Sequence, residues 1–136
     1  ITYYKGIPGI RNAYEALLED ISKGDNYYVV GETKRWLSAD KKFLLDYMKK
    51  REKLRLDLKL ILSDTPEARW NKKYEKNFGA KVKILPSKAR LDMNLIVVPN
   101  KIFFQKLTKP MMAIVVESKE AANMQKQMFE IMWQAL

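Results

Sequence analysis

The chain has 136 residues, of which 47% are apolar and 31% charged, and its formal net charge is +10 at pH 7. This composition predicts one globular domain and excludes a disordered segment, and no apolar run is long enough to span a membrane. The chain contains neither cysteine nor histidine, which excludes disulfides, zinc sites built on these residues and imidazole or thiol catalysis.

The positive charge is concentrated in the middle of the sequence. Residues 41–94 hold 16 basic and 7 acidic residues, whereas the segments on either side are close to neutral. A basic segment favours an anionic partner such as nucleic acid. Lysines that solvate helix faces would give the same pattern, and this interpretation is the favoured one.

Strand and helix patterns alternate through the first part of the chain. Apolar residues at helical spacing follow a turn at 6–9, and Gly24 ends that helix. Ser38 is the expected N-cap of the next helix, and Asp64 or Thr65 that of the third. The expected elements are a strand at 2–5, a helix from Ile10 to Ile21, a strand at 26–31, a helix after Ser38, a strand at 56–62 and a helix from Pro66 to Phe78.

Strands dominate the second part of the chain until a final helix. Ser118 is its expected N-cap, and its apolar residues are expected to face the core: Ala121, Met124, Met128, Ile131 and Met132. An adaptable partner surface is the alternative for the methionines. The expected strands are 81–85, 91–98, 102–107 and 111–116. This order predicts a single α/β domain over 1–136, with a mixed sheet flanked by helices.

The stretch from Leu91 to Phe104 has the pattern of two strands joined by a turn. It resembles the core hairpin of the phospholipase D superfamily, whose first strand carries histidine, then lysine two residues later, then aspartate after four apolar residues. Asp92, Asn94 and Pro99 stand at those three positions. None can attack phosphorus or hold a phosphate as that chemistry requires. We therefore expect no catalytic residues, no metal and no cofactor. An unusual phosphodiesterase ranks below the two functions given at the end of this section.

A wider resemblance covers almost the whole chain. The opening Tyr3–Ile10, with its Gly-x-x-Gly-Ile sequence, and the closing Ala113–Ser118 strand with Phe129-x-x-x-Trp133 resemble the phospholipase-D-like domain of TrmB-type, sugar-specific transcriptional regulators. In that family a winged-helix DNA-binding domain precedes this module. The resemblance implies that the chain, which starts at Ile1 without methionine, is a cytoplasmic fragment lacking that domain. It also implies pairing with a second copy.

Open α/β sheets bind ligands at the carboxyl ends of their parallel strands. Asp92 and Asn94 would share one face of a strand, and Trp36 follows two cations. The alternatives are an ordinary strand-to-helix turn at 31–33, a core position for Trp36 and a solvated loop that contains Lys88 and Arg90. The predicted ligand-binding residues are Glu32, Thr33, Arg35, Trp36, Lys88, Arg90, Asp92 and Asn94.

These patterns predict a non-catalytic dimerisation and effector-sensing module of a TrmB-like transcriptional regulator. Its expected partners are a second copy, a sugar or another metabolite, and DNA through the missing winged helix, with no membrane. The alternative is a nucleic-acid-binding module that uses the basic region 41–94, and its affinity would fall steeply with salt.

Overall fold

Seven strands form one mixed sheet in the order β1-β7-β6-β5-β2-β3-β4. The computed structural model describes residues 1–86 and 88–136, with Leu37 described by its backbone alone. The strands are β1 (Thr2–Lys5), β2 (Asn26–Gly31), β3 (Asp57–Leu62), β4 (Ala80–Ile84), β5 (Asn94–Val98), β6 (Lys101–Lys106) and β7 (Met112–Glu117). The helices are α1 (Gly6–Leu17), α2 (Thr33–Ala39), α3 (Lys41–Lys53), α4 (Pro66–Lys73) and α5 (Lys119–Ala135), with a 3₁₀ turn, η1 (Glu75–Phe78).

The sheet has a parallel part and an antiparallel part that meet at β2. Strands β2, β3 and β4 are parallel, and their crossovers contain α2, α3 and α4. Strand β5 pairs antiparallel with β2, and β6, β7 and β1 continue the antiparallel part. The predicted α/β domain with a mixed sheet is therefore confirmed.

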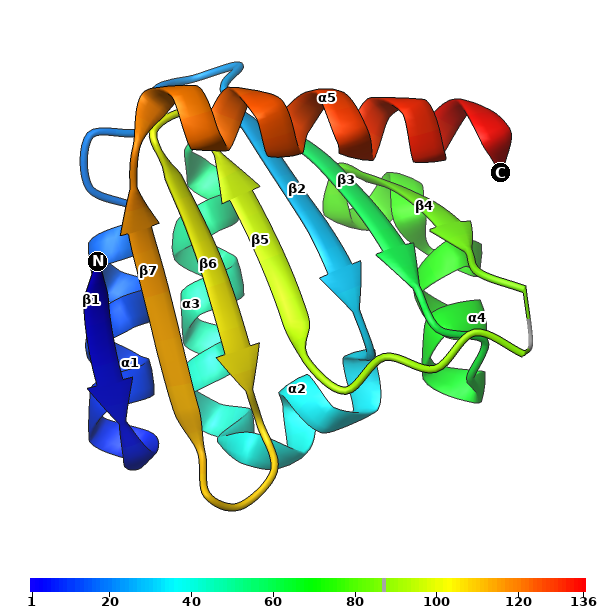
Figure 1. Ribbon diagram of the computed structural model, residues 1–136. Coiled ribbons are helices and arrows are strands. Elements are labelled where there is room, and N and C mark those ends of the chain that lie inside the picture. Colours follow the sequence, from blue (N-terminus) through cyan, green and yellow to red (C-terminus); the bar gives the residue numbers. More distant parts are fainter. Residues whose placement is uncertain (87) are drawn as a thin grey trace.

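Helices cover the two faces of the sheet unequally. Helices α1 to α4 lie behind the sheet in Figure 1, and α5 alone crosses the front. Alternation along β2 explains the two cores, because Tyr27 packs with the residues of α1 and α3, whereas Tyr28 packs with Phe129 of α5. Among the described helices, none has the length and apolar character that a membrane span requires.

Two of the predicted helix caps are confirmed. Thr65 Oγ1 accepts a hydrogen bond from the Ala68 amide at 3.1 Å, and Ser118 Oγ accepts one from Ala121 at the same distance. The Ser38 cap is wrong, because this residue lies inside the unpredicted helix α2 and its hydroxyl donates to the Arg35 carbonyl. Asp40 caps α3 instead, accepting from the Phe43 amide at 3.3 Å.

The predicted turn at 6–9 is also wrong, and the predicted inward face of α5 is wrong for Met124, Met128 and Ile131 but right for Met132, which packs against the Phe129 cluster. Helix α1 already begins at Gly6. In α5 the core residues are Ala122 and Phe129, whereas Met124 is 67% exposed and Ile131 is 73% exposed. Both sets of residues recur at helical spacing, so the periodicity alone does not identify the buried set.

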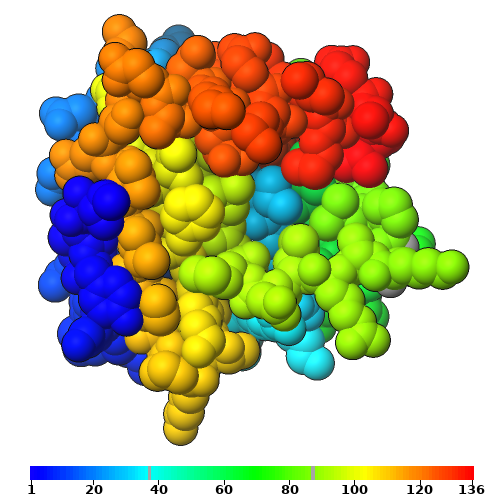
Figure 2. Space-filling model, in the orientation of Figure 1, coloured from blue at the N-terminus to red at the C-terminus, as the bar shows by residue number. Residues whose placement is uncertain are grey.

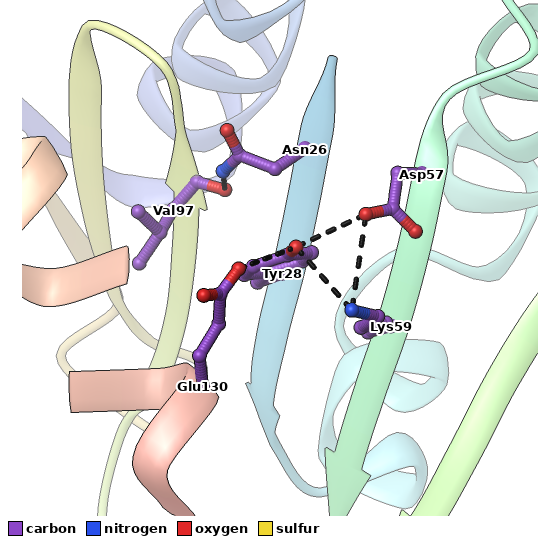
Figure 3. A network of polar contacts seen from close by, with 6 residues as sticks. All are labelled: Asn26, Tyr28, Asp57, Lys59, Val97 and Glu130. Atoms are coloured by element: carbon purple, nitrogen blue, oxygen red, sulfur yellow. Dashed lines mark hydrogen bonds and ion pairs between the residues drawn. The ribbon is translucent and has the colours of Figure 1, made fainter. Parts of the chain in front are cut away.

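Polar contacts fasten α5 to the sheet as well as apolar ones. Figure 3 shows the hydroxyl of Tyr28 between Asp57 and Glu130, at 3.0 and 3.2 Å, with the Lys59 ammonium at 3.5 Å. The buried Asn26 side chain donates to the Val97 carbonyl nearby. Burial, followed by the carboxylates around the hydroxyl, raises the pKa of Tyr28. The hydroxyl therefore remains protonated and can donate to one carboxylate at a time.

Candidate functional site

A cleft of about 480 Å³ opens between the rear face of the sheet and helices α3 and α4. Strands β2, β3 and β5 form its floor, with α3 on one side, α4 and η1 on the other, and α2 at one end. Its volume falls within the range of small-molecule sites. Most of its wall is apolar, formed by Leu45, Met48, Leu60, Leu62, Trp70 and Phe78.

Polar groups gather where β2 ends, at one end of the cleft. Asn94, at the first position of β5, is 5% exposed, and its Oδ1 accepts a hydrogen bond from the Glu32 amide at 3.0 Å. Asn71 of α4 donates to Thr33 Oγ1 at 3.1 Å. Gly31 leaves room for the Asn94 side chain, because a Cβ at this position would lie 2.6 Å from Asn94 Oδ1. These contacts hold the loop after β2, the start of β5 and the side chain of Asn71 on α4 together at this end of the cleft.

Trp36 closes this end of the cleft from α2. Its Nε1 donates to the Tyr14 hydroxyl, which in turn donates to Gln105 Oε1 at 2.7 Å, and Gln105 Nε2 donates to the Phe103 carbonyl. Trp36 also packs against the core cluster, and Trp36 and Gln105 both line the cleft. The Trp36 indole therefore both packs in the core and lines the cleft, which the sequence analysis gives as alternatives.

Arg51 lies at the opposite end of the cleft. The residue is 9% exposed, and its guanidinium stands 5.0 Å from the ring centroid of Tyr27, the second residue of β2. The sequence pattern placed Arg51 in a cationic run at a helix end. Burial in the last turn of α3 distinguishes it from Lys49 and Lys50, which are exposed.

The hydroxyls of Tyr27 and Tyr47 adjoin the Arg51 end and that of Tyr14 adjoins Trp36, and none of the three supplies an acid. The Tyr27 and Tyr47 hydroxyls are 2.9 Å apart. Burial raises the pKa of Tyr14, Tyr27 and Tyr47, and for Tyr27 the nearby Arg51 charge offsets part of that rise. All three hydroxyls therefore act as neutral hydrogen-bonding groups.

The structure brings four of the eight predicted ligand-binding residues to the cleft: Glu32, Thr33, Trp36 and Asn94. Arg35 is beside it, paired with Glu32 at 3.1 Å and donating to the Leu91 carbonyl. Lys88 and Arg90 are exposed and do not line the cleft.

Asp92 is also exposed and lies outside the cleft. The prediction that Asp92 shares a strand face with Asn94 is wrong. Strand β5 begins at Asn94, and Asp92 is in the bend before it, where strand alternation does not apply. The predicted turn at Pro99–Asn100 is confirmed.

Several residues of the cleft have no local sequence signal. Arg51, Glu67 and Trp70 look like ordinary helix-surface residues in the sequence, and only the positions of α3 and α4 bring them together. Within residues 1–86 and 88–136, no group of three or more acidic side chains is arranged to hold a metal ion.

Comparison with solved structures finds TrmBL2, described as an archaeal chromatin protein with a novel mode of DNA binding. The TM-score is 0.63 over 98% of this chain, at 12% sequence identity. The match covers 52% of the TrmBL2 chain, so this chain spans about half the length of that protein. No protein-family model and no curated protein matches the sequence. The fold of this chain is therefore similar to that of about half of the TrmBL2 chain.

Proposed function

We propose that this chain is the non-catalytic dimerisation and effector-sensing module of a TrmB-like transcriptional regulator. The likeness to TrmBL2 over almost the whole chain carries the proposal. That protein binds DNA and is about twice as long as the matched region. In the protein that contains this chain, contact with DNA would belong to a winged-helix domain outside this sequence.

The hairpin positions support a non-catalytic role. Asn94, which stands where the phospholipase D pattern has lysine, holds the Glu32 amide and is almost fully buried. Asp92, at the histidine position, is exposed in a bend that precedes the strand. Pro99 lacks both a carboxylate and a backbone donor. The three groups of that pattern therefore have no substitutes at these positions.

The front of the molecule supports dimerisation. Below α5, none of the described helices covers the front of β1, β7 and β6 (Figure 1 and Figure 2). Tyr3, Ile114, Phe104 and Leu95 are cross-strand neighbours there and share one face of the sheet. Leu95 packs against the Phe129 cluster, which places this row on the α5 side. We call the row, together with the exposed apolar residues of α5, the open face: Tyr3, Leu95, Phe104, Ile114, Met124, Met128 and Ile131.

Charge favours a second copy as the partner on the open face. The chain has a net charge of +10, so two copies repel each other over most surfaces. The exposed side chains of α5 from Asn123 to Leu136 carry no charge. Lys5 and Lys106 lie beside the row on the same face of the sheet. Two copies therefore meet with least repulsion along α5, where a two-fold arrangement would bury the same residues on both.

The proposed mechanism couples the cleft to the dimer. The cleft lies between helices and the sheet face opposite the open face, so a ligand that draws α3 and α4 together favours one arrangement of the sheet and α5. The ligand shifts the population only by its difference in affinity for the two arrangements. In the whole regulator, the chosen dimer geometry would set the spacing of the winged helices on DNA.

Sedimentation equilibrium of this chain tests the dimer. We expect a dimer that Ile131→Glu converts to a monomer, because the substitution places two like charges in the interface. The control is Ile7→Glu, which changes another exposed isoleucine, on α1, away from the open face. A monomeric wild-type chain, or a dimer that survives Ile131→Glu, contradicts the proposal.

A nucleic-acid-binding module is the second candidate, and helix α3 favours it. Lys42, Lys49 and Lys53 are exposed and share one face of α3, but Asp46 lies on the same face and reduces its positive potential. Titration of a labelled DNA duplex at several salt concentrations separates the two candidates. The regulatory module predicts no binding by this chain, whereas affinity that falls linearly with log salt favours the alternative.

A further inference from the structure

The cleft is more apolar than a sugar site and contains one buried cation. Its walls are aliphatic and aromatic over α3, α4 and η1, with Leu45, Met48, Trp70 and Phe78 facing the same space. Trp70 remains 52% exposed, although it packs against Tyr74 and Phe78 with ring centroids 5.0 and 5.5 Å away. Sugar sites need many hydrogen-bonding groups, and these walls supply few.

Arg51 is the unusual group in these surroundings. The residue is 9% exposed and lines the cleft, and among the residues that the structure describes no carboxylate forms an ion pair with it. Its observed partner is Tyr27, through the ring face and a hydrogen bond to the neutral hydroxyl, which is weaker than an ion pair with a carboxylate. A buried guanidinium without a counter-charge is costly, because burial removes its hydration. An anion entering the cleft would relieve this cost.

The charges along the cleft also define a direction. Arg51 is beside Tyr27, near the start of β2, whereas Glu32 and Glu67 line the cleft where β2 has ended. Glu32 is paired with Arg35, and the exposed Lys41, at the first position of α3, also lines the cleft. Glu67 Oε2 is buried and has no hydrogen-bond partner among the described residues. The Glu67 carboxylate therefore repels an anionic group from its part of the cleft, whereas Arg51, which has no paired carboxylate, attracts one.

We infer that the cleft binds an amphipathic carboxylate, with its anionic head on Arg51 and its apolar body between the side chains of α3 and α4. The planar guanidinium can hold both oxygens of a carboxylate at once. This inference rests on the proposed sensing role, and it names the chemical class of the effector.

Decanoate is a suitable probe, with 1-decanol and maltose as comparisons. Binding is followed by tryptophan fluorescence, because Trp36 and Trp70 line the cleft, and by calorimetry. We expect saturable decanoate binding that Arg51→Met weakens by about 10- to 100-fold, the loss of one charge-assisted interaction. The same variant should leave 1-decanol binding unchanged. Lys53→Met is the matched control, because it removes one exposed charge from the same helix.

Trp70→Ala provides a second variant if Arg51→Met does not fold. Since Trp70 is half exposed, its loss is tolerated, and it should weaken decanoate and 1-decanol alike. Equal decanoate affinities of Arg51→Met and Lys53→Met overturn the inference, as does the absence of saturable binding. Maltose binding in the cleft would overturn it while supporting effector sensing. A monomeric chain that binds decanoate would uphold the inference and contradict the dimerisation proposal.

Discussion

Gly31 and Asn94 form the tightest pair at the polar end of the cleft. In Gly31→Ala, the new Cβ would lie 2.6 Å from Asn94 Cγ and Oδ1, far inside normal contact distance, so the amide must move. Movement breaks the 3.0 Å hydrogen bond from the Glu32 amide in a site where Asn94 is buried. An unpaired buried group costs about 1–3 kcal/mol and overpacking about 1–3 kcal/mol.

Alanine reduces the entropy of the unfolded chain, which offsets about 0.4–1 kcal/mol of this cost. We therefore expect Gly31→Ala to lower the free energy of unfolding by about 2–4 kcal/mol. Asn94→Ala removes the atoms at 2.6 Å and leaves one contact at 3.1 Å to its Cβ. In that background Gly31→Ala should cost under about 1 kcal/mol.

Urea unfolding of the wild type, both single variants and the double variant measures this coupling. Unfolding free energies that add to within about 0.5 kcal/mol would refute the reasoning, since residues that do not touch behave in this way.

Three further predictions test the packing and the electrostatics. Phe129→Ala should lower the free energy of unfolding by about 3–5 kcal/mol, because the ring is buried. Met128→Ala, at the neighbouring exposed position, should change it by less than about 0.5 kcal/mol. Urea unfolding measures both, and equal losses would contradict the observed rotation of α5. Burial alone would raise the pKa of Glu75, but the hydrogen bond from the Val82 amide and the nearby lysines lower it below the usual value. Its stabilising contribution is therefore present at neutral pH and is lost as pH falls through the folded-state pKa, so Glu75→Gln should flatten the acid limb of a stability–pH profile, and an unchanged limb would contradict this. Tyr28→Phe should lower the free energy of unfolding in urea by about 1–2 kcal/mol, because one partly buried hydroxyl links three charged groups. An unchanged unfolding free energy would show that water replaces the hydroxyl.

Much of the fold is predictable because its elements have strong local signals. Each expected strand coincides with an observed one to within three residues, since the strands are short runs of β-branched and aromatic residues between turns. The caps at Thr65 and Ser118 are local as well. Helix α2 was missed because it has seven residues and no side-chain cap. The element that the sequence does not predict is thus one that has no local signal of its own.

The site is less predictable, because it depends on which helices stand side by side. Glu32 and Thr33 follow from the rule that ligands bind at the carboxyl ends of parallel strands, and Asn94 from its position in the hairpin pattern. Arg51 does not, because a cation in the last turn of a helix usually faces solvent. The apolar wall between α3 and α4 also depends on the distance between two helices, which no local pattern encodes.

The face of α5 shows the same limitation for the proposed interface. Met124, Met128 and Ile131 have the spacing of a core stripe, and so do Ala122 and Phe129. The larger ring stacks on Tyr28 at 4.5 Å between ring centroids, which fixes the rotation of the helix. The displaced stripe is left exposed and becomes available to a partner.

The most direct test of the central claim is the length and sequence of the natural polypeptide that contains this chain. Intact mass of the natural protein and sequencing of the coding region before Ile1 would provide it. A regulatory module of a TrmB-like regulator predicts a winged-helix domain of roughly 100 residues in that region. A natural protein in which no DNA-binding domain accompanies this module would contradict the account, and the basic region 41–94 would then be the leading indication of function.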